Sequence, residues 1–288
     1  MKAQQDSLSK ESVQGSPPAE QARSDRREFL RTLGRAVAYT GAVAGGAKGA
    51  LAAMAERPAS PVPDYDWNAH RWGYGVDANR CIGCLRCVQA CKYENDVPWT
   101  HSHFRTWVER YVYLEGEALP RIDSHSDPRN VAAAVAPTDY RFDNRYQGKK
   151  VVKAFFLPKI CNQCAKPSCV KVCPVGATYK APDGVVLIDH EYCIGCGYCV
   201  QACPYGARYF DHNKGVSDKC TWCYHRITKG MQPACVEVCP VNARIFGDLN
   251  DPGSPIRRFI ETHRVEVLHP ETGNMPTVFY AGLNQEVV

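Results

Sequence analysis

Short stretches in which apolar and polar residues alternate recur along the chain and predict strands. They are residues 72–77, 104–114 and 277–280, together with the apolar, strand-favouring run 151–157. The tripeptide Pro182-Asp183-Gly184 separates two further apolar segments and predicts a hairpin over 178–188. Residues 256–260 predict a helical turn. With 22 glycines and 20 prolines, loops should dominate, so the expected fold class is a loop-rich α+β with short antiparallel strands.

The 16 cysteines fall into four runs of four. The third run, CIGCGYCVQACP at residues 193–204, has the cysteine spacing and final proline with which bacterial ferredoxins bind [4Fe–4S] clusters. Because each cube takes four thiolates, the count predicts four [4Fe–4S] clusters with no cysteine left over. The runs consist of Cys81, Cys84, Cys87 and Cys91; Cys161, Cys164, Cys169 and Cys173; Cys193, Cys196, Cys199 and Cys203; and Cys220, Cys223, Cys235 and Cys239.

The four runs form an A-B-A-B repeat. The first reads CIGCLRCVQAC and the third CIGCGYCVQAC, so they differ at two positions only. The second ends CVKVCPVGA and the fourth CVEVCPVNA. A duplicated two-cluster ferredoxin explains this order.

Structural zinc and disulfides are the alternative uses of these cysteines. Zinc sites use paired C-x-x-C units, but they do not require a third and a fourth cysteine at further spacings of three and four residues, followed by a proline. A disulfide framework does not explain the repeat. No C-x-x-C-H is present, which excludes covalent haem by this signature.

Side chains beside the cysteines suggest how the clusters are surrounded. Arg208, Lys219 and Arg244 either offset cluster charge or are solvated surface cations, and the sequence leaves both readings open. Nearby apolar residues should cover the cubes, and nearby aromatic residues should shield them. The apolar residues are Ile82, Val170, Val172, Ile194, Val236 and Val238, and the aromatic ones are Tyr192, Tyr198, Tyr205 and Trp222.

The formal net charge of +5 does not indicate a nucleic-acid-binding protein. Residues 1–55 contribute eight basic and five acidic side chains, so the remainder carries only about +2. No apolar run after residue 55 is long enough to span a membrane. Any membrane contact is therefore expected through a partner.

The N-terminal segment is similar to a twin-arginine export signal. Arg26-Arg27 is followed by Phe29-Leu30, then by a weakly apolar stretch rich in glycine and alanine. The stretch ends in Ala53-Met54-Ala55, a small-x-small cleavage pattern. Its lysine and its many glycines disfavour a membrane anchor. We expect residues 1–55 to be the signal and the mature protein to be periplasmic.

The remaining chain divides by composition. Residues 56–69 form a proline-containing linker, and residues 70–250 hold all four runs. A polar insertion at about 115–148 separates the first two runs, with a short helical turn expected at 131–136. Residues 251–288 form a C-terminal extension.

The combination of four runs with DKCTWCYHR at 218–226, CPYGAR at 203–208 and PACVEVCP at 233–240 resembles one family. It is that of the four-cluster iron–sulfur subunits of the molybdopterin oxidoreductases, such as dimethyl sulfoxide reductase and polysulfide reductase. The resemblance covers about residues 70–283. It implies two ferredoxin-like modules related by pseudo-twofold symmetry.

The resemblance also implies that runs one and four share ligands, and that runs two and three do so. We name the four ligand sets after their first residue. The Cys81 set is Cys81, Cys84, Cys87 and Cys239; the Cys220 set is Cys220, Cys223, Cys235 and Cys91; the Cys161 set is Cys161, Cys164, Cys169 and Cys203; the Cys193 set is Cys193, Cys196, Cys199 and Cys173.

The family implies a non-catalytic electron-transfer subunit. Its partners would be a multi-span quinone-reactive membrane subunit and a molybdopterin catalytic subunit or a cytochrome subunit, in sulfur-compound metabolism. The alternatives are a soluble periplasmic ferredoxin-like carrier and an iron–sulfur enzyme with an open cluster site. The sequence leaves the terminal substrate, the direction of electron flow and the cluster potentials undetermined.

Overall fold

The computed structural model describes residues 65–99, 103–124 and 146–283. All 16 cysteines lie within these ranges. The export signal expected at 1–55, most of the linker and the helical turn expected at 131–136 fall outside the described residues.

A four-stranded sheet joins the beginning and the end of the described chain. Its order is β10 (Val265–Glu266), β11 (Val278–Ala281), β1 (Trp72–Asp77), β9 (Arg244–Asp248). Strand β1 runs antiparallel to β9 but parallel to β11. The expectation of antiparallel strands was therefore wrong for this pair. Parallel neighbours need a long connection, and here it spans all four cysteine runs.

Helix α8 (Pro255–Thr262) packs on this sheet. Its first residue is proline, and the Ser254 hydroxyl accepts a hydrogen bond from the Arg257 N–H, as an N-cap does. A Cβ on Gly75 of β1 would lie only 2.7 Å from the Phe259 ring, so the glycine permits this close approach. The helical turn predicted at 256–260 is confirmed and is longer than expected.

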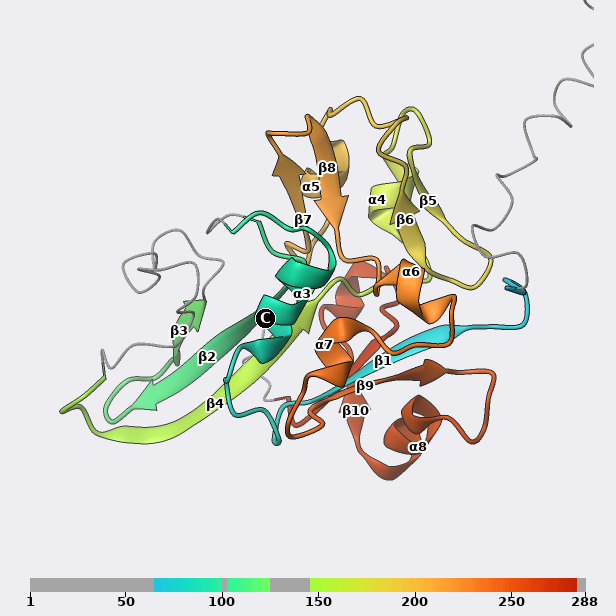
Figure 1. The fold of residues 1–288 in the computed structure, drawn as a ribbon. Coiled ribbons are helices and arrows are strands. Elements are labelled where there is room, and N and C mark those ends of the chain that lie inside the picture. The colour runs from blue at the N-terminus through green and yellow to red at the C-terminus, as the bar shows by residue number, and fades with distance from the viewer. Residues whose placement is uncertain (1–64, 100–102, 125–145, 284–288) are drawn as a thin grey trace, which may run out of the picture. The chain divides into compact units, whose positions relative to one another are not determined.

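A second sheet is built on two long strands. β2 (Thr106–Leu114) pairs antiparallel with β4 (Val151–Ile160), and β3 (Arg121–Ser124) covers the other edge of β2. Figure 1 shows the β2–β4 ribbon extending beyond the helices. The segment expected as a polar insertion thus supplies a strand.

Two hairpins complete the strands. The predicted hairpin is present as β5 (Thr178–Lys180) and β6 (Val186–Ile188). A second one, β7 (Arg208–Asp211) with β8 (Val216–Lys219), was not predicted. Its turn is held by the Asp211 carboxylate, which accepts from two backbone N–H groups, and by Gly215 at φ +67°. Figure 1 shows three helices between these hairpins and the four-stranded sheet: α3 (Arg86–Glu94), α6 (Tyr224–Ile227) and α7 (Ala234–Glu237).

The helices in the described ranges are short, and four of them contain cysteines. The longest of these helices is α3 (Arg86–Glu94), and none of them has the length and apolar character needed to cross a bilayer. The one-turn helices are α4 (Ser168–Lys171), α5 (Tyr198–Gln201), α6 (Tyr224–Ile227) and α7 (Ala234–Glu237), with a 3-10 turn η2 (Pro270–Thr272). The fold is mixed α/β with small sheets and few helices, compatible with a ferredoxin-like fold.

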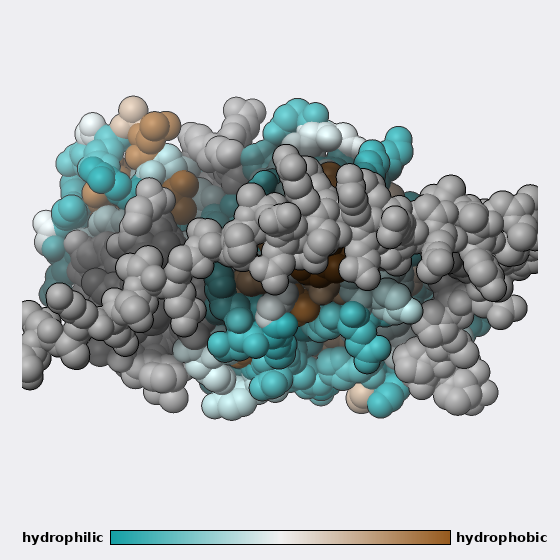
Figure 2. Space-filling view, turned by 90° about the horizontal axis from the view of Figure 1, so that it is seen from above, coloured by the Kyte–Doolittle hydropathy of each residue, from teal (hydrophilic) through white to brown (hydrophobic). Residues whose placement is uncertain are grey.

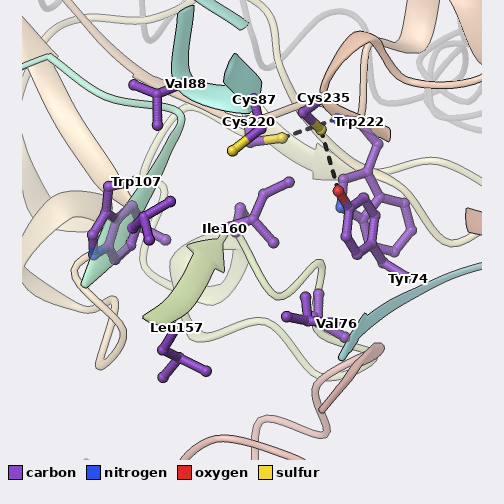
Figure 3. Close-up of a cluster of buried hydrophobic side chains, with 14 of the residues drawn as sticks. Tyr74, Val76, Cys87, Val88, Trp107, Leu157, Ile160, Cys220, Trp222 and Cys235 are labelled. Atoms are coloured by element: carbon purple, nitrogen blue, oxygen red, sulfur yellow. Dashed lines mark hydrogen bonds between the residues drawn. The ribbon is translucent and has the colours of Figure 1, made fainter. Parts of the chain in front are cut away.

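The core is continuous with the cysteine runs. Figure 3 shows the sulfur atoms of Cys87, Cys220 and Cys235 on one side of a cluster of buried apolar side chains that includes Ile160 and Trp222. On the face in Figure 2, hydrophilic residues predominate among the described ones, and a small group of hydrophobic residues is visible near the centre.

Candidate iron–sulfur centres

In the first and third cysteine runs, tight loops rather than helices hold the first two cysteines. Gly83 and Gly195 have φ angles of +67° and +69°, which L-residues with a Cβ rarely adopt. A Cβ on Gly195 would meet the backbone carbonyl oxygen of Gly215. The C-I-G-C spacing therefore wraps a sharply turned backbone around its thiols.

We expect Gly195→Ala to destabilise the iron-loaded protein more than Gly197→Ala. Both glycines have positive φ angles, which cost an alanine about 1–2 kcal/mol. At Gly197 a Cβ meets no heavy atom within 4 Å, whereas at Gly195 it meets backbone that cannot rotate away. Urea unfolding midpoints of the two variants measure the difference, and equal losses would contradict the role given to Gly215.

Helix packing brings the runs together in two pairs. Helix α3 of run one packs on α7 of run four, and α4 of run two packs on α5 of run three. All sixteen thiols are free of disulfides. Eight are buried, whereas Cys84 and Cys196, which occupy the same place in the two A runs, are exposed.

Run one reaches into run four at Cys91. Burial and the nearby thiols of Cys220, Cys235 and Cys223 raise the Cys91 pKa well above its usual value. The Asn95 amide lies 3.7 Å from Cys91 Sγ and 3.6 Å from Cys223 Sγ, so it can donate to both. A proline follows the last cysteine in the other three runs, but Lys92 follows Cys91. Lys92 is buried, and its ammonium group donates to the carbonyl oxygens of Pro98 and His103.

The Cys161 set lines one pocket. Cys161, Cys164, Cys169 and Cys203 surround it together with Arg208. The Arg208 Nη2 atom is buried and has no hydrogen-bond acceptor among the described residues. A pocket with four thiols and an unpaired guanidinium N–H fits a group that is negatively charged and offers sulfur acceptors, as an iron–sulfur cube does.

The thiols are not arranged to converge on one ion. In the described ranges no group of three or more His, Cys, Asp or Glu side chains has the spacing for a single metal ion. Zinc ligands must meet at one atom, whereas the thiolates of a cube each bind a different corner.

Burial is the main influence on the thiol pKa values. It raises the pKa of Cys81 to about 11 and that of Cys164 to about 12. Cys173 differs: burial opposes its ionisation, but backbone N–H groups of residues 175–178 outweigh it and lower the pKa. Since iron binds the thiolate, cluster insertion must displace protons from most of these cysteines.

Backbone and side-chain donors face several sulfur atoms. The N–H groups of Thr178, Trp222 and Ala243 lie 3.4, 3.3 and 3.3 Å from the sulfurs of Cys173, Cys220 and Cys239. The Tyr74 hydroxyl lies 3.2 Å from Cys235 Sγ. Such donors stabilise charge on cluster ligands. Sequence reasoning missed Tyr74, which stands 161 positions before Cys235 and gave no local signal.

The three cations left open by the sequence are buried. Arg208, Lys219 and Arg244 are 5%, 0% and 3% exposed, so the surface interpretation was wrong and charge compensation of the thiolates is favoured. Among the aromatic residues expected to shield the clusters, Trp222 is buried, whereas Tyr192 and Tyr198 are 68% and 59% exposed. Ile82 and Ile194, expected to cover the cubes, are also exposed.

Comparison with known proteins agrees with this chemistry. A 4Fe-4S dicluster domain family matches residues 152–249, and a 4Fe-4S binding domain family matches residues 78–94. The second match contains the first cysteine run, and the first match contains the other three runs.

Relatives extend the similarity over most of the chain. The tetrathionate reductase subunit designated B in Salmonella typhimurium is 39% identical over 267 residues, which is 92% of this chain and 91% of the relative. The protein of the same name from Archaeoglobus fulgidus is 43% identical over 216 residues, which is 75% of this chain and 84% of the relative. The sulfite dehydrogenase subunit designated B in Allochromatium vinosum is 39% identical over 217 residues, which is 71% of this chain and 80% of the relative. The chain belongs to the 4Fe–4S iron–sulfur electron-transfer subunits of the dimethyl sulfoxide reductase family, in which a partner subunit is the catalytic one.

Proposed function

We propose that this chain carries electrons through four [4Fe–4S] clusters bound by the Cys81, Cys220, Cys161 and Cys193 sets. The observation that carries this proposal is the four-thiol pocket of the Cys161 set with its unpaired Arg208 nitrogen. The mutual proximity of Cys91, Cys220, Cys223 and Cys235 supports the Cys220 set. Cys81 lies near Cys87 and Cys239, which supports the Cys81 set. The Cys193 set follows from the repeat and from the packing of α4 on α5.

Electrostatic interactions between thiols of different sets favour one linear order. Cys87 of the Cys81 set lies near Cys235 of the Cys220 set, and Cys220 lies near Cys161. Arg208 lies near both Cys161 and Cys199, which joins the Cys161 set to the Cys193 set. The order is therefore Cys81, Cys220, Cys161, Cys193. Two modules related by pseudo-twofold symmetry would place the two A runs at opposite ends.

The two ends of this order are suited to contact partners. Each carries an exposed cysteine, Cys84 or Cys196, beside an exposed isoleucine, Ile82 (57%) or Ile194 (63%). Exposed apolar side chains next to a redox group favour a surface that another subunit covers. We assign one end to a quinone-reactive membrane subunit and the other to a molybdopterin catalytic subunit or a cytochrome subunit, at the periplasmic face and in sulfur-compound metabolism. The names of the relatives support the last point.

Anaerobic pull-down of the tagged native protein, with mass spectrometry of its partners, tests this assignment. We expect a multi-span membrane protein together with a molybdopterin or cytochrome subunit. Ile82→Asp and Ile194→Asp should each lose one partner and keep the other, because a charge in an apolar interface is costly to desolvate. Recovery of the chain alone, or loss of both partners in either variant, would contradict the assignment of separate ends. Exposed Leu119, on the β2–β3 connection, provides a control substitution to aspartate.

A further inference from the structure

Three buried cations occupy successive places along the proposed order of clusters. Arg244, Lys219 and Arg208 are each at most 5% exposed. They come from different strands: Arg244 begins β9, Lys219 ends β8 and Arg208 begins β7. Both arginines stand five residues after the last cysteine of a run, within CPYGAR and CPVNAR.

Arg244 lies between the first two sets. Its charge acts on Cys81 and Cys87 on one side and on Cys235 on the other. The guanidinium is held by two hydroxyl groups, donating to Tyr74 Oη at 3.2 Å and to Thr106 Oγ1 at 2.9 Å. Neutral hydroxyl groups therefore fix the position of the guanidinium group, and these partners do not neutralise its positive charge near the thiols.

Lys219 lies between the second and third sets. Its charge acts on Cys161 and Cys169 and on Cys220. Its Nζ donates to the carbonyl oxygens of Val186 and Cys220 and contacts the Gln163 side-chain oxygen at 3.5 Å. Three oxygen acceptors match the three N–H bonds of an ammonium group, whereas a neutral amine would direct a lone pair at one of them. Burial disfavours the charged form and lowers the pKa of Lys219, and the nearby thiols of Cys161 and Cys220 oppose this shift.

Arg208 lies between the third and fourth sets. Its charge acts on Cys169 and Cys161 and on Cys199. Nη1 donates to Thr178 Oγ1 at 3.3 Å, and the neighbouring Nη2 has no acceptor among the described residues. This guanidinium is again held by a neutral hydroxyl on one side.

None of the three cations pairs with a carboxylate in the ranges that the structure describes. By contrast, Arg105, which also lies near Cys91, forms a paired contact with Asp218 at 2.9 Å. A buried charge without a counter-ion is costly. The nearby negative groups that can compensate these three are the cysteine ligands and the clusters that they would hold.

We infer that Arg244, Lys219 and Arg208 raise the reduction potentials of the clusters on either side of them, with one cation at each junction. This inference rests on the ligand sets of the proposed function. When a cluster accepts an electron from its donor it gains one negative charge, and no bond changes. A fixed positive charge in a poorly solvated site lowers the free energy of the reduced form more than that of the oxidised form.

The arrangement predicts which potentials respond to which cation. Removing Arg244 should lower the potentials of the clusters in the Cys81 and Cys220 sets. Removing Lys219 should affect the Cys220 and Cys161 sets, and removing Arg208 the Cys161 and Cys193 sets. The two arginine variants therefore share no affected cluster, and the lysine variant shares one with each. This pattern can be recognised without assigning any spectrum to a cluster.

The experiment is an anaerobic redox titration of the iron-loaded full chain, followed by electron paramagnetic resonance. Arg244→Gln, Lys219→Gln and Arg208→Gln should each lower two of four midpoint potentials, reducing the ratio of reduced to oxidised cluster about tenfold, which is about 59 mV for one electron. Arg110→Gln is the control: the Arg110 side chain is 13% exposed and pairs with Asp123 of β3, so the potentials should not move.

Arg208→Lys and Arg244→Lys separate charge from shape. They keep the positive charge and should keep the wild-type potentials. Unmoved potentials in fully iron-loaded glutamine variants, or both arginine variants shifting the same clusters, would overturn the inference. If the glutamine variant of Arg208 or of Arg244 loses iron, a shift of the potentials in the matching lysine variant overturns the inference instead. Wild-type protein with fewer than four clusters would contradict the proposed function, and the inference with it.

Discussion

Removal of the iron is expected to abolish the cooperative unfolding transition of the protein. Four of the cysteines, Cys87, Cys161, Cys220 and Cys235, belong to the main buried core, so the ligands and the core are one structure. Binding of a structural metal contributes about 10–16 kcal/mol in zinc-finger peptides, as large as the 5–15 kcal/mol that stabilises a whole domain. Clusters that join run one to run four should therefore carry most of the folding free energy. Circular dichroism during thermal unfolding, before and after anaerobic chelation, measures this loss.

Two single substitutions sharpen this prediction. Cys235 is buried and contacts Tyr74, whereas Cys196 is exposed at one end of the cluster order. Cys196→Ser should lose one cluster, leaving about twelve of about sixteen iron atoms, and should keep most of the thermal stability. Cys235→Ser should lose at least as much iron and far more stability, because its loss opens the core. Equal melting temperatures of the two variants would refute this ranking.

Deleting residues 277–288 is expected to unfold the protein, although this segment contains no cysteine. The deletion removes β11, whose Val278 and Tyr280 are fully buried between β10 and β1. Burial of two such side chains is worth about 3–6 kcal/mol, comparable to the stability of a whole domain. Thr277 also donates to the carbonyl oxygens of Asn162 and Gln163, which hold the loop of run two.

The matched control for this deletion is a chain that ends at Leu283, which keeps the whole of β11. Its urea unfolding midpoint and its iron content should equal those of the full chain. The longer deletion should show neither a folded baseline in urea nor full iron loading. If both shortened chains unfold at the wild-type midpoint, β11 does not contribute to the stability of the sheet.

Much of the candidate site could be predicted because its signals are local. A C-I-G-C loop needs its glycine and its two cysteines within four residues, and the same turn recurs in the first and third runs. The hairpin at Pro182-Asp183-Gly184 is likewise a matter of turn chemistry between neighbouring residues. The β7–β8 hairpin carries comparable signals in Asp211 and Gly215, which could have been read from the sequence.

Other features depend on residues that are distant in the chain. The parallel pairing of β1 with β11 joins positions about two hundred residues apart, and no local pattern specifies the partner of a strand. Whether Arg208, Lys219 and Arg244 are surface cations or buried ones could not be decided from their type, since burial depends on what packs over them. The exposure of Tyr192 and Tyr198 is a result of the same kind.

The sequence by itself determined the chemistry of this protein: sixteen thiols in a repeated ferredoxin spacing, and hence iron–sulfur clusters and electron transfer. Only the tertiary structure decided which runs lie together, which cysteines are exposed, and that Arg208, Lys219 and Arg244 are buried. The physical reason is that ligand spacing is enforced by covalent geometry over a few residues, whereas burial and charge environment are enforced by packing between segments that the chain brings together only when it folds.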